Sequence, residues 1–432
     1  MSLNSPNLLS AIDAYKSIQN GSLTCQNLIR SCFDRIEERN PLIHAFTATN
    51  RELALKQAYE IDRLPSNSGS LHGIPFAVKD VIESSEYITT FGSKIYAEFQ
   101  PVSDAGCIVQ SRERGALLIG KVDTSEFATQ TPSKTCNPLS LNRTPGGSSS
   151  GSAAAVADYM VPIAFGTQTT GSIIRPAAYC GIVGYKPTFD LIPSAGLKML
   201  SHSQDTIGIL ARNVADVAFF TFGMFGDKDS LKSPHSPRIG ICLSNQWSHA
   251  STEITESIDR LVIKLENAGA IISTIKLPNE LEDLVDIQSK VFAFEALRTL
   301  AYERINFSEC LSPRLNTRLQ GGVEISLTDY LQMRGQIMRS MQKVSRLFKN
   351  VDVLLYPSAE GEAEIGLLNS GSPRFGAIWT LLHLPCISIP IDFGSTGLPL
   401  GAQLIGAYCE DKKLLSIANF ASLAVDFPKS KI

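Results

Sequence analysis

The feature that most constrains the fold is a glycine and serine run at residues 145–152, Pro-Gly-Gly-Ser-Ser-Ser-Gly-Ser. Runs of this composition often form flexible linkers. Here, however, residues 153–156 follow at once with the sequence Ala-Ala-Ala-Val. Small residues in succession favour a helix that packs closely against its neighbours. We therefore expect the run to lead directly into a core element, and not to be a linker.

Two other interpretations of the same run compete with this one. A phosphate-binding loop ends in Gly-Lys-Ser/Thr, with the lysine on the phosphates, and the run contains no lysine. Residues 147–151 match the G-x-S-x-G pattern of an α/β-hydrolase elbow, with Ser149 as the nucleophile. That elbow follows a strand directly, and residues 139–145 are too polar for a central strand. Four later histidines keep this alternative open in weakened form: His202, His235, His249 and His383.

Short apolar runs alternate with helical patterns between residues 71 and 225. The apolar runs predict buried strands at residues 74–78, 116–119 and 163–165. The helical patterns lie at residues 103–114 and 151–160. Alternation of this kind is typical of an α/β fold in which helices cover both faces of a sheet.

The rest of the chain continues in the same style. A helical hairpin is predicted at residues 6–40, and residues 226–237 are polar enough for a surface connection. Apolar positions at helical spacing predict an amphipathic helix at residues 253–269. Further predictions are strands at 238–242, 351–356 and 386–389, mostly helix at 280–350, a helix before 386, and a helical tail from Lys412.

Composition excludes several classes of protein. Hydrophobic residues make up 44% of the chain and the net charge is -3, without a long basic run. A nucleic-acid or anionic-membrane partner needs a concentrated positive field, so we expect neither. The first residues lack a basic region before their apolar ones, and no apolar stretch reaches the roughly 18 residues that span a bilayer. We expect a cytoplasmic protein.

Nine cysteines are scattered along the chain, and none forms a CxxC pair. A zinc ribbon or a redox motif is therefore unsupported. An odd number fits poorly with a fully paired secreted framework, so we expect most of these thiols to be reduced and buried. No cluster with metal-ligand spacing is evident, and neither a metal nor an organic cofactor is expected.

Three segments taken together carry a family resemblance. They are residues 73–80 (Gly-Ile-Pro-Phe-Ala-Val-Lys-Asp), the run at 145–152, and residues 166–176 (Gly-Thr-Gln-Thr-Thr-Gly-Ser-Ile-Ile-Arg-Pro). In this order, with Ser148 and Ser172 lying 24 residues apart, the chain resembles the amidase signature family. Further matches occur at residues 120–121, 126–128, 137–138, 180–181, 184–188, 205–208 and 397–403.

The resemblance implies a fold and a domain plan. The expected fold is a large mixed β-sheet core with helices on both faces, in a single amidase domain over residues 1–432. Within it we expect the signature core at about 70–225, a helical substrate-shaping region at about 253–350, and a return to the core at 351–432. Five aromatic or sulfur side chains from that helical region and its surroundings could line an apolar pocket, although each is more typical of a core: Phe292, Phe294, Tyr330, Met333 and Trp379.

The resemblance also implies roles for individual residues. Ser172 would attack the amide carbonyl, and Ser148, at an unusual cis peptide, would connect it to Lys79 as the base. The turn Thr169-Thr170-Gly171-Ser172 would supply N–H groups to the oxyanion. Ser148 would then protonate the leaving nitrogen, and water would hydrolyse the acyl-enzyme.

Lys79 has to be neutral to accept a proton, whereas a free lysine titrates near 10.4. Burial lowers the pKa of a lysine because it disfavours the charged form, and the apolar residues 74–78 could supply that burial. The competing interpretation is a structural ion pair between Lys79 and Asp80. The companion motifs favour the catalytic interpretation.

The sequence departs from the common family form around Ser172. Gln168 stands where the family has Asp, Thr170 where it has Gly, and Ile174 where it has Arg, with Arg175 one position later; Ser125 also replaces a usual acid. The polar network around the nucleophile must therefore differ, because Gln168 carries no charge. We expect Arg175 either to pair with a carboxylate or to be a solvated helix residue.

The expected function is hydrolysis of a carboxamide bond in a small-molecule amide, by a stand-alone amidase that could form a homodimer. One alternative is the glutaminase subunit of a tRNA-dependent amidotransferase, which runs the same chemistry within a complex. Another is a non-catalytic scaffold with a fossil site. The identity of the amide is left open by the sequence.

Overall fold

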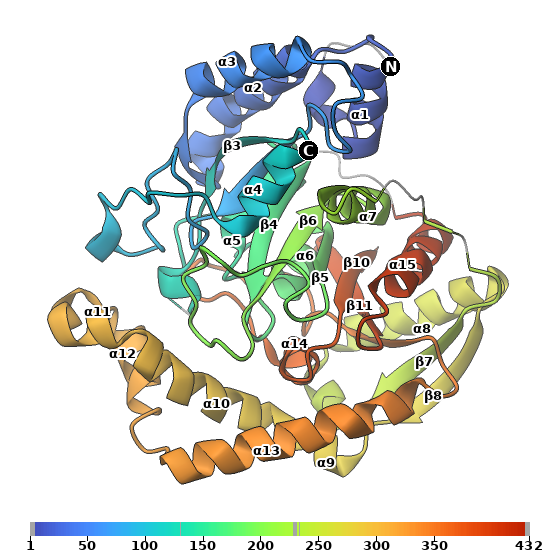
Figure 1. Cartoon of the computed structure of the whole chain (residues 1–432). Coiled ribbons are helices and arrows are strands. Elements are labelled where there is room, and N and C mark those ends of the chain that lie inside the picture. The colour runs from blue at the N-terminus through green and yellow to red at the C-terminus, as the bar shows by residue number, and fades with distance from the viewer. Residues whose placement is uncertain (1–4, 130, 228–230, 233, 428–432) are drawn as a thin grey trace.

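The computed structural model describes residues 5–129, 131–227, 231–232 and 234–427. Its centre is one sheet of eleven strands in the order β1-β3-β2-β4-β6-β5-β10-β11-β9-β7-β8 (Figure 1). The strands are β1 (Phe46–Thr49), β2 (Pro75–Lys79), β3 (Leu117–Val122), β4 (Ile163–Gln168), β5 (Val183–Lys186), β6 (Thr206–Ala211), β7 (Arg238–Leu243), β8 (Ile271–Lys276), β9 (Val353–Pro357), β10 (Cys386–Phe393) and β11 (Pro399–Gly406).

The sheet is mixed. Strand β2 runs parallel to β3 and to β4, and β7 runs parallel to β8 and to β9. The strands between these two groups, from β4 through β6, β5, β10 and β11 to β9, pair antiparallel. Because β2 and β4 are parallel neighbours, their carboxyl ends, Lys79 and Gln168, lie at the same edge of the sheet.

Helices cover both faces of this sheet. On one face α5 (Ser150–Ala157) packs against β2, β3, β4 and β6, and its neighbour α6 (Ile174–Cys180) packs against β5, β10 and β11. The opposite face carries a second group of helices: α4 (Gly106–Glu113), α7 (Val214–Met224), α8 (Thr252–Asn267) and α15 (Asp411–Val425).

Helix α5 shows why the sequence folds as it does. All eight of its residues are buried, and its small side chains let the helix lie close to the strands. At Gly151 an added Cβ would come within 2.3 Å of the Asp123 nitrogen and 2.4 Å of the Ala45 oxygen, so no larger residue fits. The glycine and serine run thus enters a close-packed core helix, as the small residues after it predicted.

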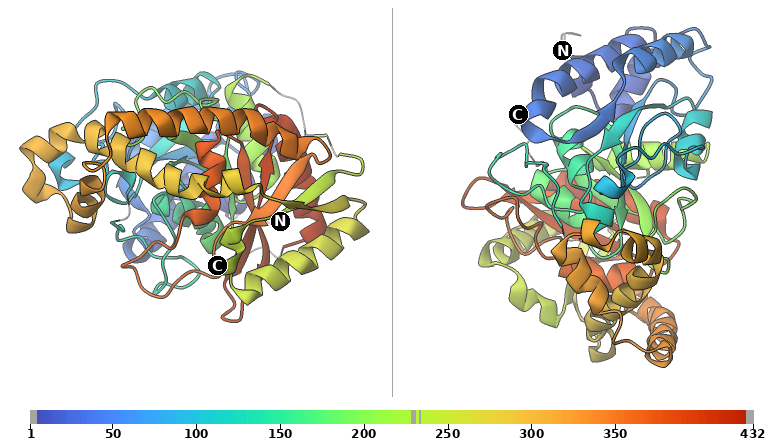
Figure 2. Two further views of the ribbon diagram at one scale, coloured as in Figure 1. Left: turned by 90° about the horizontal axis from the view of Figure 1, so that it is seen from below. Right: turned by 90° about the vertical axis from the view of Figure 1, so that its left-hand side faces the viewer.

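Two groups of helices flank the sheet. At the N-terminal end lie α1 (Ala11–Gln19), α2 (Cys25–Ile43) and α3 (Arg51–Asp62). At the other end a helical arm is built from α9 (Asn279–Glu282), α10 (Leu284–Thr299), α11 (Ala301–Asn306), α12 (Pro313–Gln320) and α13 (Leu327–Val344). Helix α13 runs alongside α10, as Figure 1 and the left-hand view of Figure 2 show. The remaining helix, α14 (Arg374–Leu381), connects the arm to the sheet by packing on α10.

The elements predicted from the apolar patterns are present, including the helical stretch at 280–350, whereas the strands β1, β5, β6, β8 and β11 were not predicted. Of the predicted connection at 226–237, residues 228–230 and 233 lie outside the described residues. Among the described residues, no helix is both long and apolar enough to cross a membrane. All nine cysteines are free, and seven of them are buried.

Candidate active site

Lys79 is the last residue of β2 and its side chain is completely buried. Its Nζ lies 2.7 Å from the Ser148 Oγ and 2.8 Å from the Thr167 Oγ1, and it donates a hydrogen bond to each. Thr167 comes from the adjacent parallel strand β4. The sheet therefore fixes the lysine between two hydroxyl groups, and no carboxylate of the described chain forms an ion pair with it.

The surroundings of Lys79 lower its pKa to about 7, and burial is the main cause. The Arg175 guanidinium lowers this pKa further, whereas the Asp205 carboxylate opposes the shift. A lysine with such a pKa is partly neutral near neutral pH, so it is able to accept a proton.

The competing ion pair between Lys79 and Asp80 is wrong. Asp80 pairs with another buried lysine, Lys121, at 3.1 Å, and it also accepts hydrogen bonds from Thr90. Successive residues at the end of a strand point in opposite directions. Asp80 therefore faces away from the Lys79 amine even though the two are adjacent in the chain.

Ser148 lies in the loop that precedes α5 and is 2% exposed. The peptide bond between Gly147 and Ser148 is cis. Gly146 has a φ of +80°, and an added Cβ there would lie 2.8 Å from the Cα of Pro176 in α6. The loop is thus pressed against α6, and glycine is required at this point of contact.

Ser172 lies in the turn between β4 and α6 and is half-buried. Its carbonyl oxygen accepts a hydrogen bond from the Ser149 N–H at 3.3 Å, which joins this turn to the loop that carries Ser148. No hydrogen bond links the hydroxyls of Ser148 and Ser172, both of which the structure describes. The structure thus brings Lys79 and Ser148 into contact and places the Ser172 main chain beside them.

The turn at residues 169–172 is anchored from several sides. The Thr169 hydroxyl donates to Asp205 at 2.5 Å, and Gln288 of α10 donates to the Thr170 hydroxyl at 2.9 Å. Gly171 lies so close to Pro373 that an added Cβ would approach its oxygen to 2.9 Å. Within the described part of the chain, the N–H groups of Thr170, Gly171 and Ser172 have no acceptor. They are therefore rigidly held donors.

Gln168, at the position where the family form has Asp, is completely buried at the end of β4. Its Oε1 accepts from the N–H groups of Ile173 and Ile174, at 2.8 and 3.1 Å, at the start of α6. Its Nε2 donates to the Thr380 hydroxyl at 3.0 Å, which in turn donates to the Thr170 carbonyl at 3.0 Å. These contacts are made without a charge at residue 168, and they use both ends of the amide: an Asp could accept from α6 but could not donate to Thr380.

Arg175 of α6 matches neither expectation drawn from the sequence. It is 4% exposed, so it is not a solvated helix residue, and it forms no ion pair with any described residue. Its Nη2 donates to the Gly147 carbonyl, and to the Ser370 hydroxyl at 3.5 Å. The sequence could not reveal this contact because Gly147 lies 28 residues away in the chain.

The elbow interpretation, with Ser149 as the nucleophile, is wrong. Ser149 is completely buried, and its hydroxyl donates to the Thr167 carbonyl at 3.1 Å and accepts from the Thr167 N–H at 3.2 Å. The described residues between 123 and 149 form no strand and take part only in two isolated bridges, Asn137 with Ser140 and Arg143 with Ile365. Ser149 therefore ties the loop to β4 and cannot reach a substrate.

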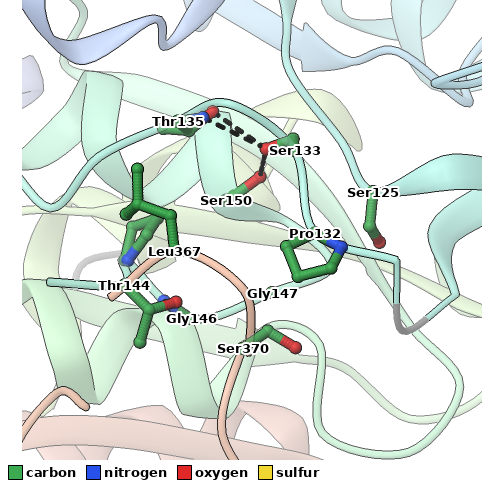
Figure 3. A pocket seen from close by; sticks show the side chains of 11 residues that line it. Ser125, Pro132, Ser133, Thr135, Thr144, Gly146, Gly147, Ser150, Leu367 and Ser370 are labelled. Carbon is green, nitrogen blue, oxygen red and sulfur yellow. Dashed lines mark hydrogen bonds between the residues drawn. The ribbon is translucent and has the colours of Figure 1, made fainter. Parts of the chain in front are cut away.

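A small pocket borders the loop on the side of Gly147 (Figure 3). Hydroxyl side chains dominate its wall, and Ser133 is hydrogen-bonded there to Ser150 at 2.9 Å. Ser370, the partner of Arg175, lies on the opposite side, and Ser125 also lines the pocket. Ser125, which stands where an acidic residue was expected from the resemblance, thus lies near the candidate site.

The predicted apolar lining is only partly available. Trp379 is completely buried and packs edge-to-face on Tyr356 at 5.4 Å, so it is a core residue. Phe294 is 4% exposed and stacks on the half-buried Tyr330 at 4.1 Å. The side chain of the helical arm that hydrogen-bonds to the turn is polar: Gln288 donates to the Thr169 carbonyl and to the Thr170 hydroxyl.

Sequence reasoning missed Thr167, Asp205, Thr380 and Gln288. Asp205 lay within a matching segment, but nothing in its spacing assigned it a contact. It is buried, at 5% exposed, and accepts from the N–H groups of Leu200 and Ser201 at 2.6 and 3.0 Å. Its position behind Thr169 depends on the antiparallel pairing of Gln168 with Thr206, which only the folded sheet provides.

Comparison with known proteins supports one assignment. A family model described as Amidase matches residues 27–415. The A-subunit of glutamyl-tRNA(Gln) amidotransferase from Endomicrobium trichonymphae is 30% identical, over 94% of this chain and 95% of that protein. The protein of the same name from Staphylococcus saprophyticus is 31% identical, over 93% and 94%.

Solved structures agree. A crystal structure of an amidase has a TM-score of 0.89 at 27% identity and covers 96% of this chain and 100% of that one. Native peptide amidase from Stenotrophomonas maltophilia has a TM-score of 0.85 at 25% identity, with 98% of each chain covered. With its mixed eleven-stranded sheet and a family match over most of its length, this chain belongs to the amidase signature family.

Proposed function

We propose that this protein hydrolyses carboxamide bonds, with Ser172 as the nucleophile and Ser148 and Lys79 as the proton relay. The observation that carries the proposal is the 2.7 Å contact between the Lys79 Nζ and the Ser148 Oγ, in a site that lowers the lysine pKa to about 7. A serine hydroxyl needs a base to become an effective nucleophile. A buried lysine without a carboxylate partner is suited to that task.

In the proposed reaction the Ser172 Oγ attacks the carbonyl carbon while its proton passes to Ser148, whose own proton passes to Lys79. The tetrahedral intermediate collapses as Ser148 protonates the leaving nitrogen and regains a proton from Lys79. Ammonia or an amine departs and leaves an acyl ester on Ser172. Water then attacks this ester through the same relay, which releases the carboxylic acid and restores the serine.

The turn at residues 169–172 supports the oxyanion part of this proposal. Its N–H groups at residues 170–172 have no acceptor within the described chain, while its side chains and carbonyls are anchored by Asp205, Gln288 and Thr380. Donors that are fixed before the reaction stabilise the negative charge without reorganisation, and each is typically worth about 3 kcal/mol in serine hydrolases.

A second candidate is the glutaminase subunit of a tRNA-dependent amidotransferase. The curated relatives described above carry that name and match almost the whole chain, so sequence similarity favours this candidate over a free-standing hydrolase. The two share the serine chemistry and differ in substrate and setting. For a subunit we expect glutamine as the amide and a partner complex that receives the ammonia.

The helical arm is proposed to shape the substrate site in either case. Its helix α10 reaches the turn through Gln288, which donates to the Thr170 hydroxyl and to the Gln204 side chain at 2.8 Å. Changes in α10 should therefore alter which amide is accepted, without removing the relay.

The test combines covalent labelling with product release. A fluorophosphonate should label Ser172 in the wild type, identified by peptide mass, and ammonia or amine release should be measured over a panel of amides that includes glutamine. Ser172→Ala and Lys79→Ala should both abolish turnover. Labelling that persists in Ser172→Ala would overturn the assignment of the nucleophile.

The same panel separates the two candidates. A free-standing amidase should turn over at least one simple amide at full rate as the purified chain. A glutaminase subunit should prefer glutamine and should gain activity when purified together with partner subunits. Absence of both labelling and turnover would favour a scaffold without catalytic activity.

A further inference from the structure

Arg175 is unusual among the buried charged residues of this protein. Burial lowers the pKa of its guanidinium to about 10, and its Nε and Nη1 have no hydrogen-bond partner in the described structure. Its contacts are made by Nη2 alone, to the Gly147 carbonyl and the Ser370 hydroxyl. A buried guanidinium without a carboxylate is unfavourable, so folding alone gives no reason to have it here.

Several other buried charges among the described residues are compensated. Asp158 forms ion pairs with two arginines, at 2.7 and 3.0 Å, and Lys121 pairs with Asp80 at 3.1 Å. Asp216 accepts from the first N–H groups of α1, at 2.9 and 3.0 Å. Arg175 instead donates to the carbonyl of the peptide bond that leads into Ser148.

The position of that contact connects Arg175 to the relay. The Gly147 carbonyl belongs to the same peptide unit as the Ser148 nitrogen, so a donor that holds this oxygen fixes the plane from which the Ser148 side chain extends. The positive charge also acts on the amine at the other end of the relay, because Arg175 lowers the pKa of Lys79. One side chain thus acts on both members of the relay.

We propose that Arg175 is a positioning residue: it orients Ser148 through the Gly147 carbonyl, and its buried positive charge keeps Lys79 in the neutral amine form. The inference rests on the proposed function of the relay. It assigns to this chain's own arginine, one residue beyond the position of the family arginine, a role that acts through Ser148 and Lys79 without contact to the substrate.

The charges around the relay determine whether the pKa of Lys79 should rise or fall when Arg175 is replaced. Asp205 raises the pKa of Lys79, and Arg175 opposes it. Around Arg175 itself lie Tyr179, Glu364 and Glu360, each of which favours the charged guanidinium. Arg175 therefore stays positive throughout the range in which Lys79 titrates, and removal of its charge should raise the pKa of Lys79.

Two substitutions separate the charge from the hydrogen bond. Arg175→Gln removes the charge and retains an N–H donor, whereas Arg175→Lys retains the charge and loses the planar donor geometry. The matched control is Arg212→Gln. Arg212 is another guanidinium whose pKa burial lowers, and it donates to main-chain carbonyls including that of Val161. It follows β6 at the edge opposite to Lys79 and is half-buried, so it controls for loss of a guanidinium that holds main-chain carbonyls far from the relay.

The first measurement is the pH dependence of fluorophosphonate labelling at Ser172. In Arg175→Gln we expect the acid limb to move up by about one pH unit, which slows labelling about tenfold below the limb. In Arg175→Lys the limb should stay in place while the plateau rate falls. In Arg212→Gln both should match the wild type. If the acid limb does not move in Arg175→Gln, the proposed role of the charge is wrong. If the plateau rate does not change in Arg175→Lys, the proposed role of the hydrogen bond is wrong.

The second measurement needs no nucleophile and therefore distinguishes failure of this inference from failure of the proposed function. The effect of Arg175→Gln on urea unfolding would be compared at pH 6 and pH 9, once in the wild-type background and once in Lys79→Met. Lys79 and Arg175 are both positive at pH 6 and repel each other, whereas Lys79 is neutral at pH 9. Arg175→Gln should therefore destabilise the protein less at pH 6 than at pH 9. In Lys79→Met that difference should vanish. An equal difference in both backgrounds would overturn the link between Arg175 and Lys79, whether or not Ser172 is labelled.

Discussion

Replacement of Lys79 by methionine should abolish turnover and yet stabilise the protein. The folded structure holds the Lys79 pKa at about 7, against an ordinary value of 10.5. Between these two values the unfolded chain binds a proton that the folded chain does not. The difference disfavours folding by roughly 4–5 kcal/mol at pH 7, at about 1.4 kcal/mol for each tenfold change in the equilibrium.

Methionine removes this penalty but also removes two hydrogen bonds. The hydroxyls of Ser148 and Thr167 lose the Nζ at 2.7 and 2.8 Å, at a cost of about 1 kcal/mol each. The net expectation is that Lys79→Met unfolds with a free energy about 2–3 kcal/mol larger than the wild type at pH 7.

The dependence on pH gives the sharper test. Because the lysine pKa is depressed in the folded state, wild-type stability rises with pH from about 7 towards 10.5. The advantage of Lys79→Met should therefore shrink by about 1.4 kcal/mol for each pH unit and be nearly gone by about pH 9. Urea unfolding of both proteins at pH 7, 8 and 9 would measure it. A difference that stays constant with pH would refute the claim that burial depresses this pKa.

Lys121→Met is the control, because Lys121 is equally buried but has a carboxylate partner. Its removal leaves Asp80, which is 1% exposed as a side chain, without its cation. Loss of one partner from a buried ion pair destabilises by about 3–5 kcal/mol. Two buried lysines should thus respond to the same substitution with opposite signs.

Three further predictions follow from the same contacts. The value of kcat/KM should fall about tenfold for each pH unit below an acid limb near pH 7, where Lys79 becomes protonated; a profile that is flat through this region would contradict a lysine base. Ser149→Ala should lose about 1–2 kcal/mol of stability, since its hydroxyl ties the loop to Thr167, and should still label at Ser172, which chemical denaturation and phosphonate labelling would show. Gln168→Leu should leave two N–H groups at the start of α6 without an acceptor, which costs about 2–4 kcal/mol and lowers kcat more than KM changes; an unaltered kcat in a folded variant would mean that the oxyanion turn does not depend on Gln168.

The architecture could be predicted where the pattern is local. Apolar runs ending at Val78, Ile119 and Phe165 predicted β2, β3 and β4, because a strand buried on both faces reads as a continuous apolar segment. The order of the strands in the whole sheet could not be predicted, because many neighbouring strands, such as β5 and β10, are far apart in the chain. A strand as exposed as β8, whose Ile271 is 56% exposed, gave no comparable signal.

The candidate site, too, could be predicted only where the signal is local in the sequence. Lys79, Ser148 and Ser172 lie in segments whose residue types and order resemble those of a family, so the sequence could propose them as the candidate relay. The groups that set their chemistry could not be found in this way. Thr167 contacts Lys79 from 88 residues away, and Thr380 contacts Gln168 from 212 residues away; no spacing rule joins such pairs.

Charge explains why the arrangement around Lys79 holds together. Asp205, the acid that acts on Lys79 through its charge, is engaged by Thr169 and by two main-chain N–H groups, and Asp80 is engaged by Lys121. Gln168 supplies at β4 the acceptor that α6 needs without adding a negative charge. Burial is the main cause of the low Lys79 pKa, the Asp205 carboxylate opposes it, and the Arg175 guanidinium adds to it. The low pKa of Lys79 therefore depends on its surroundings as well as on the lysine itself, and replacement of Arg175 should raise it.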